Sequence, residues 1–218
     1  YARRAPQDPR YSLLNPAALA AWQERQRAVA RLLRRLGHAD LSRLDLLEVG
    51  CGTGSNLLDC VLMGFAPERL AGIELLPDRY AAARERLPAA VTLWQGDATA
   101  LPIPPASRDI VLQATVFSSL LDDAFQQRLA DAMWQVVRPG GGVLWYDFTV
   151  DNPRNRDVRG VPLARVRALF PQGRVQAERI TLAPPIARAV SAVHPALYTL
   201  FNAVPVLRTH LLAWIARD

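Results

Sequence analysis

The apolar residues of this chain alternate between two spacings. Short apolar runs predict strands at residues 44–49, 70–75, 91–94, 110–116 and 143–148. Apolar residues at helical spacing separate these runs, at residues 55–63, 77–87 and 122–137. Strands that alternate with helices form right-handed βαβ units, so the pattern predicts an α/β fold with a mostly parallel sheet and helices on both faces.

The two ends of the chain follow a different pattern. Residues 15–36 predict an amphipathic helix. The last third predicts a helix at 161–170, a strand at 174–182, a helix at 186–204 that Pro195 should kink, and a final strand at 211–215. We therefore expect an N-terminal helical lid at 1–40 and a main domain at 41–218, with a helical insertion at about 184–206.

Composition narrows the class of protein. A chain of 218 residues, half of them hydrophobic, is long enough for one α/β domain and is not typical of a disordered chain. Cys51 and Cys60 give no disulfide framework and fit a reducing compartment. The apolar run at 196–207 is too short to span a bilayer, so we expect a soluble, cytoplasmic protein, and we predict no metal site.

Charge is distributed unevenly along the chain. The net charge is +6, made up of +5 in residues 1–40, −5 in residues 41–150 and +6 in residues 151–218. All the basic side chains apart from histidine are arginines, which genomic base composition explains. The uneven distribution also fits basic flanks that receive an anionic acceptor or an anionic surface, and both explanations stay open.

The most informative segment is Leu46-Leu47-Glu48-Val49-Gly50-Cys51-Gly52-Thr53-Gly54-Ser55. An apolar strand runs into three glycines at alternate positions and then into a helix. Glycines allow a tight turn with positive φ and let a ligand lie against bare backbone near a helix N-terminus. The spacing is G-x-G-x-G, not the G-x-G-x-x-G of dinucleotide sites. The acid at Glu48 would complement a cationic ligand and repel a pyrophosphate.

This segment resembles motif I of the class I S-adenosylmethionine-dependent methyltransferases. Four further segments match the family in order, each near a strand end: Glu74, Gln95-Gly96-Asp97-Ala98, Asp109 to Gln113, and Arg138-Pro139-Gly140-Gly141-Gly142. The order is similar to the type 11 group. The resemblance covers residues 45–148 and implies a Rossmann-like, seven-stranded, mostly parallel sheet whose last strand is antiparallel.

The resemblance also implies S-adenosyl-L-methionine as cofactor and assigns residues to it. Glu48 would hold the amino-acid end, Glu74 the ribose hydroxyls, Asp97 the adenine amino group, and Gln113 the methionine part. The full set expected at the cofactor is Glu48, Gly50, Cys51, Gly52, Thr53, Gly54, Asn56, Glu74, Leu75, Asp97, Ala98 and Gln113. Structural alternatives remain: a turn-capping Glu48, a solvated Glu74, a turn-forming Asp97, a Cys51 that only fills space, and a packed Gln113 amide.

Methyl transfer needs a general base only if the acceptor must lose a proton. Asp147 ends the predicted fifth strand, on the sheet edge where ligands bind, and either acts on the acceptor or is a structural acid. His210 and His194 titrate in the useful range and are the other catalytic candidates. A surface or packed histidine is the more common outcome for His194, beside Pro195, and His210, just before the final predicted strand, is the stronger candidate of the two.

A polar, arginine-rich loop follows the fifth predicted strand at residues 151–160. Arginines hold anionic groups through bidentate hydrogen bonds, so this loop is either an acceptor-binding segment or a solvated surface loop. The expected acceptor-binding residues are Tyr11, Asn152, Arg154, Asn155 and Arg159.

The function that these features favour is methylation of a small-molecule, glycan or lipid-linked acceptor, with oxygen as the methylated atom. RNA or protein methylation is the alternative enzyme, and a non-catalytic S-adenosylmethionine-binding protein is the alternative class. Nucleic acid is disfavoured because exposed aromatics do not interleave with the arginines. The flanking helices are explained by a lid over the donor, by peripheral contact with a membrane, or by a dimer interface.

Overall fold

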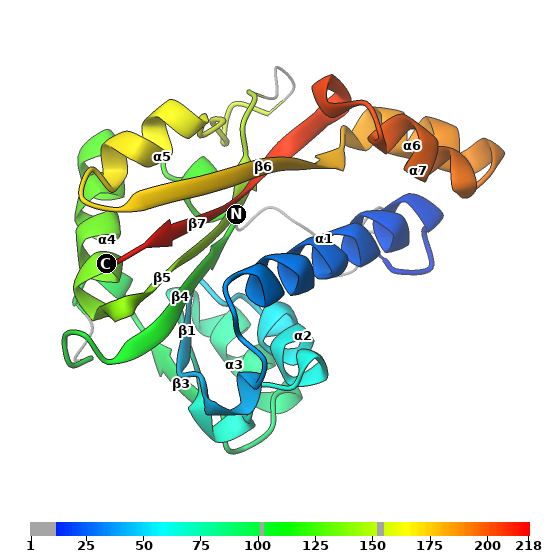
Figure 1. The fold of residues 1–218 in the computed structure, drawn as a ribbon. Coiled ribbons are helices and arrows are strands. Elements are labelled where there is room, and N and C mark those ends of the chain that lie inside the picture. Colours follow the sequence, from blue (N-terminus) through cyan, green and yellow to red (C-terminus); the bar gives the residue numbers. More distant parts are fainter. Residues whose placement is uncertain (1–11, 101–102, 152–154) are drawn as a thin grey trace.

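A computed structural model describes residues 12–100, 103–151 and 155–218. Its seven strands form one sheet in the order β3-β2-β1-β4-β5-β7-β6 (Figure 1). The strands are β1 Leu46–Val49, β2 Leu70–Glu74, β3 Thr92–Gln95, β4 Arg108–Ala114, β5 Val137–Phe148, β6 Arg174–Leu182 and β7 Arg208–Ala216. β1 to β5 are parallel, and β7 is antiparallel to both of its neighbours. The predicted fold class, with its antiparallel last strand, is confirmed.

Helices cover both faces of the sheet, as Figure 1 shows. They are α1 Pro16–Arg35, α2 Ser55–Met63, α3 Pro77–Arg86, α4 Asp123–Val136, α5 Leu163–Leu169, α6 Pro184–Val193 and α7 Ala196–Asn202. α1, α2 and α3 pack on one face, and α4 and α5 on the other. Side-chain caps fix two of the starts. Asn15 accepts a hydrogen bond from the Ala17 amide at 3.0 Å, and Asp122 accepts one from the Ala124 amide at 2.8 Å.

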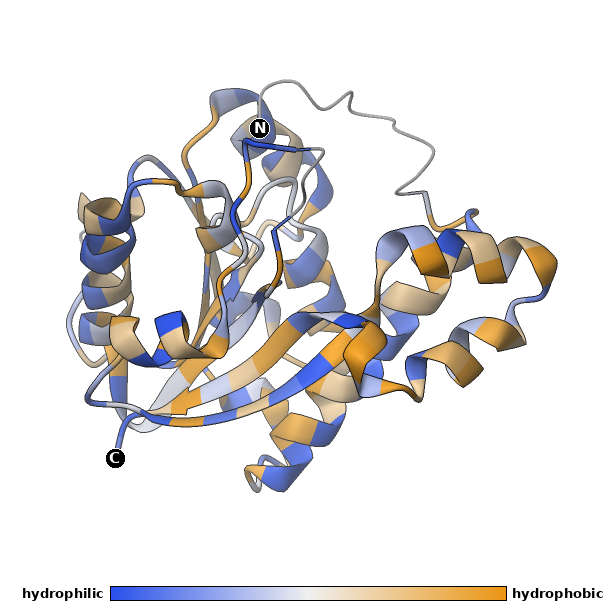
Figure 2. Ribbon diagram, turned by 90° about the horizontal axis from the view of Figure 1, so that it is seen from above, coloured by the Kyte–Doolittle hydropathy of each residue, from blue (hydrophilic) through white to orange (hydrophobic). Residues whose placement is uncertain are grey.

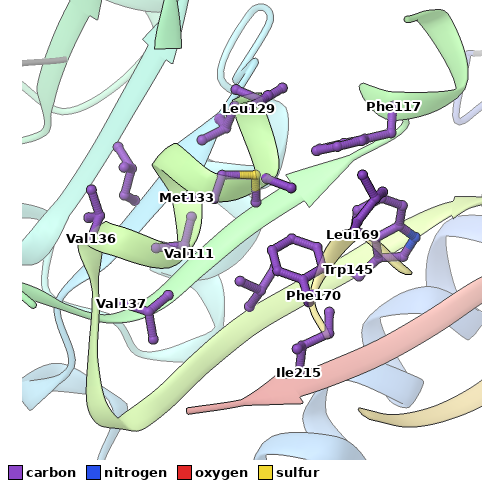
Figure 3. Packing of buried hydrophobic residues seen from close by; sticks show 14 of the residues in the cluster. Val111, Phe117, Leu129, Met133, Val136, Val137, Trp145, Leu169, Phe170 and Ile215 are labelled. Carbon is purple, nitrogen blue, oxygen red and sulfur yellow. The ribbon is translucent and has the colours of Figure 1, made fainter. Parts of the chain in front are cut away.

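The core on the α4 side is built around aromatic rings (Figure 3). Trp145 of β5 lies 4.6 Å from the Phe117 ring and 6.2 Å from the Phe170 ring, measured between centroids. Alternate β5 residues point to the other face, so Leu144 and Tyr146 belong to the core beneath α1 and α2. This alternation places Tyr146 and Asp147 on opposite sides of the sheet at the same edge.

α1 contributes to the fold along its whole length. Its second half buries Ala28, Leu32 and Leu33 against the sheet. Its first half packs against the pair α6 and α7, which extends past the end of β6. The predicted role of residues 1–40 as a lid stays a prediction.

Two sequence expectations about local structure were wrong. Residues 186–204 do not form one kinked helix, because the residue before a proline disfavours helical angles. His194 is extended, with φ −159° and ψ 134°, and so it separates α6 from α7. The second error concerns the proline-glycine turn, which is part of β5. Gly140 has a φ of +81°, and the register against β4 shifts there.

Candidate functional site

The glycine turn between β1 and α2 lies at the carboxyl ends of the parallel strands. Gly50, Gly52 and Gly54 have φ values of +68°, +57° and +81°, a region that favours glycine. A Cβ at Gly50 would lie 2.6 Å from Val116, and one at Gly54 would lie 2.7 Å from Leu87. A Cβ at Gly52 would meet no described atom within 4 Å. Two glycines are therefore required by packing, while Gly52 presents bare backbone to open space.

Glu74 connects this turn to the end of β2. Its carboxylate accepts a hydrogen bond from the Gly52 amide at 2.8 Å and from the Leu76 amide at 2.9 Å. The side chain is buried, whereas the adjacent Leu75 is exposed. Glu74 is therefore held beside the turn, where a ribose contact was expected, and it is not a solvated strand-end acid.

Glu48 carries an unsatisfied carboxylate oxygen. Asn56 donates to its Oε1 at 2.6 Å, and Oε2 is buried without a hydrogen-bond partner among the described residues. Burial raises the pKa of Glu48 to about 7, although the Asn56 hydrogen bond opposes the shift. A buried polar atom without a partner is costly in a protein, so this oxygen suits a positively charged ligand group.

The remaining residues expected at the cofactor lie in two places: Cys51 and Thr53 in the glycine turn, and Asp97 and Ala98 after β3. Cys51 is buried, and burial raises the pKa of its thiol, which fits a space-filling role against Gly72. Thr53 accepts a hydrogen bond from Arg86 at 2.8 Å, which ties the turn to α3. Asp97 and Ala98 follow β3 at the same sheet edge, and the Asp97 carboxylate is exposed and accepts from the Thr99 amide at 2.8 Å.

Gln113 is buried at the end of β4. Its Nε2 donates to the Tyr146 carbonyl at 3.5 Å, and its Oε1 accepts from the Val116 amide at 3.2 Å. These contacts hold the loop after β4 in place, which favours the packed-amide interpretation over a direct contact with the cofactor.

Asp147 occupies the predicted edge but points to the α4 face. It is fully buried and accepts hydrogen bonds from the Ser118 amide at 3.1 Å and from the Phe148 amide at 2.8 Å. Burial raises the pKa of Asp147 to about 6. The backbone contacts favour the structural alternative, and a catalytic role stays a prediction.

The two candidate histidines lie in different surroundings. His210 of β7 is buried and stacks on Tyr146, with centroids 4.9 Å apart and planes at 7°, and its ring also lies 4.0 Å from Phe148. Burial lowers the pKa of His210 to about 3, so the ring is neutral at pH 7 and a weak base. His194 is exposed, and its Nδ1 accepts from the Ala196 amide at 3.2 Å, which fits the surface interpretation.

Side chains of α1 form a polar cluster with Asp59 of α2 that was not predicted from the sequence. Asp59 of α2 accepts hydrogen bonds from Trp22 at 3.1 Å, from Arg25 at 3.2 Å and from Gln26 at 2.5 Å. The Arg25 guanidinium carbon also lies 5.3 Å from the centroid of the Tyr146 ring. The spacing of Trp22, Arg25 and Gln26 on one helix face was the available signal, but their partners are remote in sequence.

Glu24 is a buried acid of α1, and its side chain faces the insertion. Its carboxylate accepts hydrogen bonds from the Thr181 amide at 3.0 and 3.1 Å, from the Tyr198 hydroxyl at 2.7 Å and from Asn202 Nδ2 at 2.6 Å. Glu24 therefore joins α1 to β6 and α7.

The predicted acceptor loop is only partly described. Tyr11, Asn152 and Arg154 lie outside the described residues. Asn155 accepts a hydrogen bond from the Asp157 amide at 3.1 Å. Arg159 forms an ion pair with Asp123, and its amide donates to the Ser118 carbonyl at 2.8 Å, beside a shallow hollow. Arg159 thus lies near the loop after β4, with its charge already paired.

Comparison with known proteins finds methyltransferases among the proteins that resemble this chain. Residues 46–141 match a family model described as a methyltransferase domain. A demethylmenaquinone methyltransferase of Deinococcus radiodurans is 33% identical over 144 residues, which cover 64% of this chain and 56% of that protein. A probable S-adenosylmethionine-dependent methyltransferase of Mycolicibacterium smegmatis is 33% identical over 108 residues, covering 50% of this chain and 39% of that protein.

A solved structure shares the whole architecture. The crystal structure of a putative sarcosine dimethylglycine methyltransferase from Galdieria sulphuraria superposes with a TM-score of 0.66 at 14% identity, covering 90% of this chain and 86% of that chain. Identity this low is evidence for the fold alone. The chain spans 56% and 39% of the lengths of the two curated relatives.

Proposed function

Because this chain belongs to the class I S-adenosylmethionine-dependent methyltransferases, we propose that it transfers a methyl group to a small-molecule acceptor. The observation that carries the proposal is the turn of Gly50, Gly52 and Gly54, open at Gly52 and flanked by two buried acids. S-adenosylmethionine, when bound, supplies an electrophilic methyl group on a positively charged sulfur.

The residues of the turn fit such a donor. Glu48 has a carboxylate oxygen without a partner and would receive the ammonium group. Glu74 is buried at the end of β2 and would receive the ribose hydroxyls, exchanging its Gly52 hydrogen bond for them. Asp97 and Ala98 would face the adenine. The protein would then contribute chiefly by positioning the acceptor and excluding water.

Calorimetry with S-adenosylhomocysteine tests the proposal directly. The purified, ligand-stripped protein should bind it, and Glu74→Gln should bind it at least tenfold more weakly, because a charged hydrogen-bond acceptor is lost. Glu85→Gln removes an exposed acid from α3 and should leave the affinity unchanged. A wild-type protein that takes up no S-adenosylhomocysteine would refute the proposal.

The acceptor class is inferred from the exposed residues of α6 and α7 and from the name of one relative. That relative is named for demethylmenaquinone, a small molecule, and the surfaces of α6 and α7 are apolar. We propose a hydroxyl-bearing small molecule, free or linked to a lipid or glycan, as acceptor. Donor consumption in a metabolite pool distinguishes it from the alternatives: uptake of methyl groups by tRNA or protein would favour a macromolecular acceptor, and no consumption would favour a binding protein.

The loop at 151–160 offers a residue-level test of the acceptor side. Arg159→Ala should lower the rate of methyl transfer and leave the affinity for S-adenosylhomocysteine unchanged, because the residue lies beside the loop after β4 and not at the glycine turn. Arg154→Ala is expected to behave in the same way. Arg128→Ala, an exposed change on α4, serves as control. Wild-type turnover in both loop variants would remove this loop from the acceptor site.

We further propose that the insertion contacts an anionic membrane surface. Val193, Leu200 and Val206 are 78%, 65% and 76% exposed. Figure 2 shows α6 and α7 extending from the body of the protein, with many hydrophobic residues along them. Residues 184–208 contain two arginines and no acid, a composition that favours anionic lipid. Within the described part of the chain, none of the helices has the length and hydropathy needed to cross a bilayer.

Vesicle sedimentation tests this contact. The protein should bind phosphatidylglycerol vesicles more tightly than phosphatidylcholine vesicles, and the double variant Leu200→Ser, Val206→Ser should lose most of the binding. Leu62→Ser removes an equally exposed leucine from α2 and should have no effect. Equal sedimentation of wild type and double variant would contradict the proposal.

A further inference from the structure

Arg25 occupies an unusual position for a charged residue. Its side chain is 22% exposed and lies between the Asp59 carboxylate and the face of the Tyr146 ring. Asp59 is shared with Trp22 and Gln26, so three side chains of α1 converge on one carboxylate. The guanidinium carbon is thereby held over the Tyr146 ring, 5.3 Å from its centroid, a distance that suits cation–π contact.

The strand order places Tyr146, the ring that Arg25 contacts, to one side of the proposed donor residues, although Arg25 itself lies close enough to Glu48 to lower the pKa of that carboxyl. The donor residues lie on or after β1, β2 and β3, whereas Tyr146 belongs to β5, two strands from β1 on the other side. Neighbouring strands lie about 4.8 Å apart, so Tyr146 lies on the order of 10 Å from β1. A donor held by Glu48, Glu74 and Asp97 would have its adenosine at the ends of β2 and β3, which would leave the β4–β5 half of the sheet edge for an acceptor.

The surroundings of Arg25 are aromatic. The stack consists of the nearly parallel Tyr146 and His210 rings and of Phe148, which is tilted by 41° to His210 and is partly exposed. His210 adds no charge at pH 7, since burial lowers the pKa of the ring to about 3. The acids near Arg25 include Asp59, which accepts hydrogen bonds from three side chains of α1, and Glu48, whose pKa burial raises to about 7.

We propose that Arg25 and the stack of Tyr146, His210 and Phe148 form the acceptor site, and that the acceptor is a ring-containing molecule with an anionic oxygen. The guanidinium carries five N–H donors, and the hydrogen bonds that the described residues show for it go to Asp59 alone. The remaining donors can bind a carboxylate or a phenolate. The inference rests on the proposed function, because it assigns the second substrate of the same reaction.

The acceptor is unidentified, so the probes are benzoate and its uncharged isostere benzamide. Each is titrated into ¹⁵N-labelled protein saturated with S-adenosylhomocysteine, and the Trp22 indole signal, assigned with Trp22→Phe, reports on the site because Trp22 shares Asp59 with Arg25. Benzoate should shift this signal saturably, and benzamide should bind about tenfold more weakly, since it lacks the charge.

Two substitutions separate a charge effect from a folding effect. Arg25→Gln should weaken benzoate binding about tenfold, and Arg25→Lys, which keeps the charge, should bind benzoate more tightly than Arg25→Gln does. Arg31→Gln makes the same change at an exposed position of α1 and should match wild type.

Several results would overturn the inference. Equal binding of benzoate and benzamide would exclude charge recognition, and benzoate binding that survives Arg25→Gln would exclude Arg25. Arg25→Gln that weakens S-adenosylhomocysteine as much as benzoate would assign Arg25 to the donor. Failure of the wild type to bind S-adenosylhomocysteine is a separate outcome, which would refute the proposed function first.

Discussion

The proposed role of Glu48 in donor binding predicts that the affinity for the donor depends on pH. Burial raises the pKa of this carboxyl to about 7, so a large fraction is protonated at neutral pH before a ligand arrives. A protonated carboxyl does not attract an ammonium group. The donor amino group stays protonated below pH 7, so in that range the affinity depends on the ionisation of Glu48.

The size of the effect follows from the pKa. If the ligand binds the ionised carboxylate, Glu48 is about half ionised at pH 7 and only a few per cent ionised at pH 5.5. Affinity for S-adenosylhomocysteine should therefore fall about 15-fold from pH 7 to pH 5.5, which corresponds to about 1.6 kcal/mol. Because binding would lower the pKa of Glu48, close to one proton should be released per ligand at pH 5.5 and about half a proton at pH 7.

Calorimetry in buffers with different heats of ionisation measures both quantities. Glu48→Gln cannot ionise, so it should bind weakly with no change between the two pH values, and circular dichroism confirms that each protein is folded at pH 5.5. The reasoning would be refuted by a wild-type affinity that changes less than twofold, or by a variant that retains the wild-type pH dependence.

Three further expectations concern stability. Glu24→Ala removes the buried partner of three donors and should lower the free energy of unfolding by about 3–5 kcal/mol, a fall of roughly 6–20 °C in Tm, whereas Glu85→Ala at the surface should change it by less than about 0.5 kcal/mol. Burial raises the pKa of Asp147 from 3.8 to about 6, so the stability that this group contributes is present below about pH 3.8 and lost as the pH rises through 6. Asp147→Asn should remove this pH dependence, which amounts to about 2.4 kcal/mol in urea unfolding between pH 4 and pH 7. Gly54→Ala should lower Tm more than Gly52→Ala, because its Cβ would lie 2.7 Å from a leucine methyl, and a Gly52→Ala that left S-adenosylhomocysteine binding unchanged would count against an open, ligand-facing turn.

The geometry of the glycine turn, where we propose that the donor binds, could be predicted from the sequence because its determinants are local. β1, the glycine turn and the start of α2 are consecutive, so the spacing of Glu48, Gly50, Gly52 and Gly54 already defines the turn. Glu74 follows at the next strand end, and parallel strands place their carboxyl ends at one edge. The bounds of β6, residues 174–182, were also predicted as observed, because its apolar and charged residues alternate.

The contacts of the proposed acceptor site could not be predicted because the residues that make them are remote in sequence. Arg25 contacts Asp59, which is 34 residues away in the sequence, and Tyr146, which is more distant still. Both contacts form only because α1 packs across one face of the sheet. The same tertiary packing changes the chemistry of His210: a histidine in a short apolar strand suggests an ordinary pKa, and burial against Tyr146 lowers it. Periodicity indicated the helix and the strand, but not which residues they bring together.

These contacts bear on how an acceptor hydroxyl would lose its proton. His210 has a pKa of about 3 and is a weak base at pH 7, and Asp147 is buried and accepts from two backbone amides on the α4 face. A nearby positive charge favours the ionised form of an oxygen acid and so lowers its pKa. Arg25 beside the Tyr146 ring would act in this way on a phenolic acceptor, whose proton would pass to solvent water and not to a protein group. An acceptor hydroxyl that ionises near neutral pH therefore fits this site better than an aliphatic alcohol, and transfer rates to phenols of graded acidity should rise with their ionised fraction. Rates that do not change with phenol acidity would instead require a protein base.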